Sequence, residues 1–97
     1  MVYFKNLLHM IYKGEDMDII DLYVRNMSVS NVRDFAYKND IALSDEETDF
    51  VYNFIKNNYR EVIKNRDSFD LSAYKEKFSE ENFQKIEKLI KKYISYL

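Results

Sequence analysis

Residues 44–62 read SDEETDFVYNFIKNNYREV and carry the strongest local structural signal of the chain. Ser44 and Glu47 stand three residues apart, which is the spacing of a capping box that begins a helix. After this box, apolar residues recur at helical spacing and cover more than half of the helix circumference. They are Phe50, Val51, Phe54, Ile55, Tyr59 and Val62. A helix that is apolar over so much of its surface packs against several neighbours, so we predict a central helix with Phe54 buried.

The end of this central helix is left open by the sequence. Asn57 and Asn58 are weak helix formers and could end or bend the helix. Residues 60–65 could either continue the helix or form a separate turn. Residues 66–68 are the predicted loop after it.

A second capped helix precedes the central one. Ser28 is its predicted N-cap, and Met27 and Val32 hold the two positions of a hydrophobic staple around that cap. The helix is predicted to run to about Asn39, and residues 40–43 then form a short extended connection. The middle of the chain is therefore predicted to be a helix–extended loop–helix unit.

Amphipathic patterns on the N-terminal side of this unit predict two further helices. Residues 2–13 have apolar positions at helical spacing, and Gly14 can end that helix in a left-handed conformation. Asp16 is the predicted N-cap of the next helix, which runs to about Asn26.

The C-terminal side also reads as helical. A short helix is predicted over residues 72–78, and Ser79 is the predicted N-cap of the final helix, on which Ile90 is buried. Strand-like alternation is absent beyond residues 41–43. We therefore predict one all-α domain over residues 1–97, a compact bundle of five or six short helices.

The composition excludes several classes of protein. The 97 residues suit one domain, and the absence of cysteine excludes disulfides, thiolate zinc sites and thiol nucleophiles. With no proline and only Gly14, there is no glycine-rich phosphate loop. No apolar run approaches the roughly 18 residues of a membrane-spanning helix. Lys5 and His9 interrupt the pattern of a signal peptide, so we expect a cytoplasmic protein without a membrane segment.

Charge is distributed unevenly along the chain. The net charge of −2 differs from the strongly basic profile of a dedicated nucleic-acid binder. Residues 1–50 carry five bases and ten acids, whereas residues 51–97 carry ten bases and seven acids. Either the two halves face one another in the fold, or a basic C-terminal surface docks an acidic partner.

The sequence offers no convincing catalytic or metal-binding constellation. His9 is the only histidine and has no serine or cysteine at a helical offset to form a nucleophile–base pair. Asp16, Asp18 and Asp21 are spaced like oxygen ligands, but a calcium loop of the EF-hand type also needs a central glycine and a final glutamate. Acids in the first turn of a helix are the better interpretation, so we expect no enzyme, no metal and no cofactor.

Residues 27–47, MSVSNVRDFAYKNDIALSDEE, resemble the uncharacterised Bacillales family known as domain of unknown function 2624. Chains of that family are similar in length and share a capped helix, a short connection and another capped helix. The resemblance runs from Ser28 to about Ile63 and covers about half of the chain, but the stretch after Asn57 and residues 69–78 align poorly with the family. It implies a small cytosolic bacterial protein, and it carries over no site residues because the family has no established activity.

The same segment is similar to the helix–extended loop–helix of SAP and LEM-type modules, some of which bind DNA. In that alternative, Lys56, Arg60 and Lys64 would supply the phosphate contacts. However, Arg33 and Lys38 are outnumbered by acidic residues near the first helix and loop, so we do not expect a nucleic-acid partner.

The final helix is the candidate surface for association. Its apolar arc spans roughly 160°, wider than the ~100° stripe that one packing partner needs. The whole arc could be hidden between two neighbours of its own chain. Alternatively, one edge meets a protein partner, in the simplest case a second copy in a homodimer. The partner-binding residues predicted at this edge are Lys85, Leu89, Lys92 and Tyr96. The leading prediction is therefore a non-enzymatic interaction or regulatory protein that acts by protein–protein contact.

Overall fold

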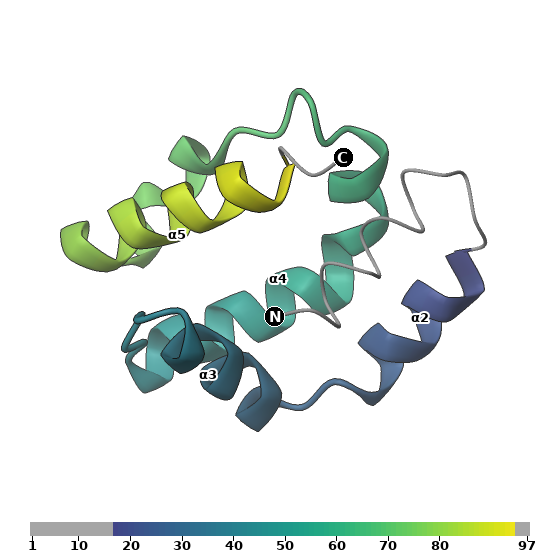
Figure 1. The fold of residues 1–97 in the computed structure, drawn as a ribbon, viewed down its shortest axis with the longest axis horizontal. Coiled ribbons are helices and arrows are strands. Elements are labelled where there is room, and N and C mark those ends of the chain that lie inside the picture. Colours follow the sequence, from purple (N-terminus) through teal and green to yellow (C-terminus); the bar gives the residue numbers. More distant parts are fainter. Residues whose placement is uncertain (1–16, 95–97) are drawn as a thin grey trace.

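The computed structural model describes residues 17–94, which form four α-helices and one 3-10 helix (Figure 1). They are α2 (Met17–Asn26), α3 (Val29–Lys38), α4 (Asp45–Lys64), η1 (Leu71–Lys77) and α5 (Glu80–Ile94). Residues 17–94 contain no β-strand, so the predicted all-α class is confirmed. The helix predicted over residues 2–13 and the Asp16 cap lie outside the described residues.

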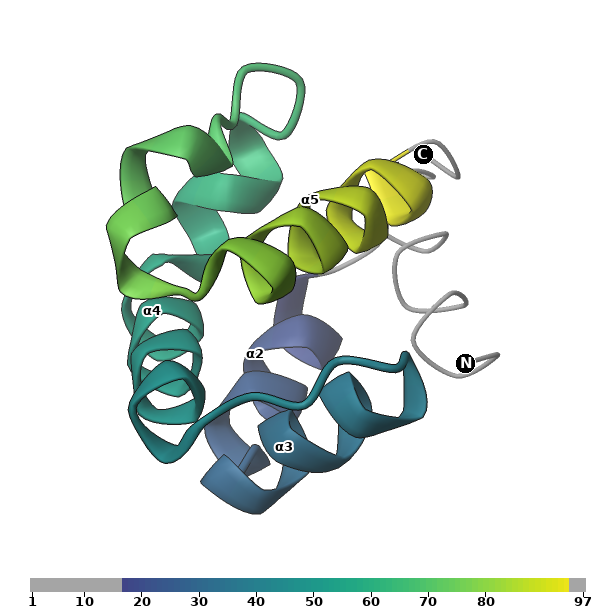
Figure 2. The same cartoon turned by 90° about the vertical axis from the view of Figure 1, so that its left-hand side faces the viewer.

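The longest helix, α4, organises the others, as its apolar circumference predicts. In Figure 1, α2 and α3 lie below α4, and η1 and α5 lie above it. Figure 2 shows the same separation of α5 from α3. Between α2 and α4, the buried residues Ile20 and Val24 pack with the partly buried Ile55, Tyr59 and Ile63 of α4.

The open question about the end of α4 is answered in favour of a continuous helix. Asn57 and Asn58 do not end it, and the Asn58 side-chain amide donates to the Phe54 carbonyl at 3.0 Å within the helix. Asn65 is the C-cap, and its backbone N–H donates to the Glu61 carbonyl at 2.9 Å. The chain then turns over residues 65–68, which agrees with the predicted loop.

A Schellman motif ends α3 and starts the extended connection. Asp40 has φ 63°, and its N–H donates to the Tyr37 carbonyl at 3.0 Å. The N–H of Ile41 reaches back to the Ala36 carbonyl at 2.9 Å. This pair of bonds defines the motif, in which the left-handed position usually belongs to glycine. Asp40 takes that position here, and Ile41 is 2% exposed.

The buried apolar core lies mainly in the N-terminal part of the described chain. Its members are Ile20, Val24, Met27, Val32, Ala36, Ile41 and Phe83. The prediction that Phe54 and Ile90 are buried is wrong in degree, because both are half-buried. The Phe54 ring packs against the short helix η1. Its centroid lies 4.9 Å from the centroid of the Tyr74 ring, which η1 carries.

Candidate functional site

The capping box predicted at the start of α4 is present. The Ser44 hydroxyl accepts from the Glu47 backbone N–H at 3.1 Å, and Glu47 Oε1 accepts from the Ser44 N–H at 2.8 Å. Ser28 caps α3 in the same manner, with Asn31 in the place of the glutamate. The predicted cap at Ser79 is also confirmed, because its hydroxyl accepts from the Asn82 N–H at 3.1 Å.

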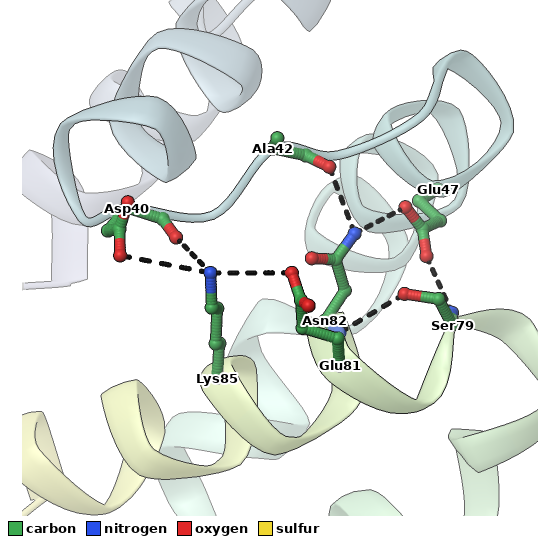
Figure 3. A network of polar contacts seen from close by, with 7 residues as sticks. All are labelled: Asp40, Ala42, Glu47, Ser79, Glu81, Asn82 and Lys85. Carbon is green, nitrogen blue, oxygen red and sulfur yellow. Dashed lines mark hydrogen bonds and ion pairs between the residues drawn. The ribbon is translucent and has the colours of Figure 1, made fainter.

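Glu47 does more than close its own box, because its carboxylate also caps α5 (Figure 3). Glu47 Oε2 accepts from the backbone N–H of Ser79 at 2.7 Å. The side-chain amide of Asn82 donates to Glu47 Oε1 at 2.8 Å and to the Ala42 carbonyl at 3.0 Å. We call Ser44, Glu47, Ser79, Asn82 and Ala42 the shared cap. In it, one carboxylate binds the N-cap N–H groups of two helices.

The electrostatics of the shared cap keep Glu47 ionised. Its side chain is 6% exposed, and this burial by itself would raise the pKa of the carboxyl group. The hydrogen bonds from Ser44, Ser79 and Asn82 outweigh burial and hold the pKa of Glu47 below its ordinary value. The positive N-terminal ends of α4 and α5 favour the same charged form. Glu47 is thus a fully hydrogen-bonded structural carboxylate.

The sequence predicted Ser44, Glu47 and Ser79 as capping residues but missed the partnership between the two helix ends. The signal available in the sequence is Asn82, which follows Ser79 by three residues as Glu47 follows Ser44. A polar residue at that position indicates a capping box, yet the asparagine amide bonds across to α4 instead.

Three of the residues predicted at the partner-binding edge lie within the described part of α5. Lys85 Nζ donates to the Asp40 carbonyl at 2.9 Å and pairs with the carboxylates of Asp40 and Glu81 at 3.8 and 3.5 Å (Figure 3). Leu89 is half-buried and Lys92 is exposed, whereas Tyr96 lies outside the described residues. Lys85 therefore joins α5 to the turn that ends α3.

Two of the three cations considered for phosphate contacts join α4 to α2. Lys56 Nζ donates to the carbonyls of Val24 and Arg25 at 2.5 and 3.0 Å, at the C-terminal end of α2, where a cation is favourable. Arg60 pairs with Asp21 at 2.5 Å. The Tyr59 hydroxyl donates to the same carboxylate, and Lys64 is exposed.

An open hollow of about 450 Å³ lies between α2 and α3. Each helix contributes four residues at positions i, i+3, i+4 and i+7, which is one continuous helical face. These residues are Ile19, Leu22, Tyr23 and Asn26 from α2, and Asn31, Asp34, Phe35 and Lys38 from α3. We call these eight residues, together with Met27 between the helices, the α2–α3 face.

The α2–α3 face exposes large apolar side chains. Ile19 is 42% exposed and Leu22 is 55% exposed, while Ile20 and Val24 on the same helix point into the core. The amphipathic pattern of residues 16–26 predicts a helix, but it does not indicate which of its apolar side chains stay exposed. The sequence signal for an exposed apolar face is the number of apolar residues in α2, which exceeds the number that one core-facing stripe needs.

Acidic clusters do not assemble a metal site in the part of the chain that the structure describes. Among these residues, no group of three or more histidine, aspartate or glutamate side chains could hold a metal ion. Asp45 pairs with Arg33 at 2.5 Å, and Glu47 lies in the shared cap. His9 and Asp16 lie outside the described residues. No helix within residues 17–94 has the length and apolarity needed to cross a membrane.

Comparisons with known proteins return no relatives. No protein-family model matches the chain, no curated protein matches it, and no solved structure matches it.

Proposed function

We propose that the protein is a non-enzymatic interaction module that binds another protein through the α2–α3 face. The observation that carries this proposal is the exposure of Ile19 and Leu22 beside an open hollow with a further apolar lining. Contiguous exposed apolar surface on a small domain is typical of a protein–protein contact. Two helices that meet at a hollow suit a partner helix laid along them.

Several polar side chains of the fold act as structural links, which supports the non-enzymatic part of the proposal. Glu47 joins α4 to α5, Asp21 joins α2 to α4, and Lys85 joins α5 to the end of α3. Lys56 and Arg60 are likewise engaged within the chain, which weakens the DNA-binding alternative. Since Lys85 is engaged too, the α2–α3 face is a better candidate than the edge of α5. A cytoplasmic location and membership of the domain of unknown function 2624 family remain part of the proposal.

A photo-crosslinking amino acid placed at Leu22 tests the proposed interface. We expect cells of the native host to yield a discrete covalent adduct from position 22. Glu76, an exposed residue of η1, is the matched control position and should yield no such adduct. Equal adducts from both positions, or none from position 22, would contradict the proposal.

A further inference from the structure

We propose that the α2–α3 face binds the same face of a second copy of this chain, in a two-fold symmetric dimer. This inference rests on the proposed function and names its partner. A two-fold contact requires a surface that is complementary to itself, both in shape and in charge. The described residues provide both kinds of complementarity.

The shape of the face combines a projection with a hollow. Leu22 is the most exposed large apolar side chain lining the hollow, and the hollow itself is bounded by Met27 and Phe35. In a two-fold arrangement, Leu22 of each copy enters the hollow of the other, so both exposed leucines are buried at once. Burial of a leucine side chain contributes favourably to association in proportion to the apolar area removed from water.

The charges of the face are also self-complementary. Asp34 and Lys38 stand one helical turn apart on α3, both line the hollow, and both are exposed. The ion pairs found among the described residues involve neither of them. A two-fold axis near the centre of α3 places Asp34 of one copy opposite Lys38 of the other and gives two equivalent ion pairs.

This balance of charge favours a second copy over a strongly charged partner. One acid and one base line the hollow, so a second copy meets no net repulsion there, and a highly acidic or basic partner gains no net attraction. The remaining lining is apolar except for Tyr23 and the side-chain amides of Asn26 and Asn31.

Variants that reverse the charge of Asp34 or of Lys38 test the dimer. Sedimentation equilibrium of the full chain should give twice the 11.8 kDa mass of one chain. Asp34→Lys and Lys38→Asp should each raise the dimer dissociation constant about tenfold or more, because each places like charges opposite one another. An equimolar mixture of the two variants should form heterodimers as tight as the unmodified protein.

Two control variants change the same charges elsewhere. Glu76→Lys and Lys64→Asp change exposed residues outside the α2–α3 face, so they should leave the dissociation constant of the dimer unchanged. Leu22→Asp should give a folded monomer, verified by its circular dichroism spectrum and melting temperature.

Three other outcomes would overturn the inference. A protein that is monomeric at every concentration, while position 22 still crosslinks to a different protein, leaves the proposed function standing and removes the dimer. A monomer in which Leu22→Asp sharply lowers the melting temperature indicates that another segment of the same chain covers the face. A dimer that is unaffected by Leu22→Asp and by both charge variants uses a different surface.

Discussion

Glu47 accepts a hydrogen bond from the backbone N–H of Ser79 at 2.7 Å, across 32 residues of sequence. A helix leaves its first N–H groups without partners, and a cap normally satisfies them from the same helix. Here the N-cap N–H of α5 is satisfied from α4. The carboxylate that begins one helix therefore also fixes the position at which a second helix starts.

Replacing Glu47 by glutamine should destabilise the protein by about 2–3 kcal/mol. The NH2 group of glutamine cannot accept the hydrogen bonds that the second carboxylate oxygen accepts, so a partly buried donor of the shared cap is left without a partner. Chemical denaturation should show this loss. Glu46→Gln is the matched control, because Glu46 is exposed, and it should cost only about 0.3 kcal/mol. Equal losses from the two variants would contradict a special role for Glu47.

The stability of the fold should fall in acid because of Glu47. The pKa of its carboxyl group is lower in the folded state than the ordinary value of 4.5, so the unfolded state binds more protons in this range. Its contribution is complete above pH 4.5 and is lost as the pH falls through the folded-state pKa. Denaturation curves from pH 7 downward should show the loss, and Glu47→Gln should reduce its slope. An unchanged slope in that variant would assign the acid sensitivity to other carboxylates.

The two partners of Asp21 should differ in their contributions to stability. The Tyr59 hydroxyl and Asp21 are both partly buried, so Tyr59→Phe should cost about 1–2 kcal/mol by removing a hydrogen bond to a charged group. Arg60 is 65% exposed, and an ion pair of this kind contributes little, so Arg60→Ala should cost clearly less than Tyr59→Phe. Thermal melts of both variants measure the difference, and the opposite order would refute this ranking.

Asp40→Gly should stabilise the protein, although it removes a charged residue. Asp40 adopts φ 63°, a conformation that is costly for residues with a Cβ atom and easy for glycine, and relief of it should contribute about 0.5–1 kcal/mol. The hydrogen bond from Lys85 reaches the backbone carbonyl of residue 40 and survives the change. Asp40→Ala is the control and should not stabilise. A lower melting temperature for the glycine variant would show that the Asp40 carboxylate matters more than the backbone conformation.

The serine caps should each contribute about 1 kcal/mol. Ser44→Ala and Ser79→Ala both remove a hydroxyl that accepts a backbone N–H in the first turn of a helix. Urea denaturation provides the measurement. Ser30→Ala is the comparison and should not destabilise the protein, because Ser30 is an exposed residue inside α3 that caps no helix. A cost near zero for either cap variant would contradict its role.

The sequence predicted those features whose causes are local. Ser44 is predicted as a cap by its spacing from Glu47, and Ser28 and Ser79 are predicted by the apolar residues that flank them in a hydrophobic staple. The continuity of α4 through Asn57 and Asn58 was not decided by the sequence. Their low helix propensity is a small effect, and the packing of Ile55, Tyr59 and Ile63 against α2 opposes it.

The features that the sequence missed depend on residues brought together by the fold. The role of Glu47 in α5 required the starts of two helices to meet. Lys85 was predicted at a partner-binding edge, and the sequence did not show that it binds the Asp40 carbonyl in a turn formed without the usual glycine signal. The α2–α3 face was missed because its two stripes lie on different helices, and only their juxtaposition forms the hollow.

The bond between Glu47 and Ser79 also makes one amide a reporter of helix docking. The N–H of Ser79 has a partner only on another helix, whereas the N–H of Phe83 bonds to the Ser79 carbonyl within its own helix. Hydrogen–deuterium exchange at Ser79 therefore reports the separation of α5 from α4, and exchange at Phe83 reports the unwinding of α5 itself. If Ser79 exchanges faster than Phe83, α5 separates from α4 while it is still helical, and the two amides measure the free energies of these two openings separately.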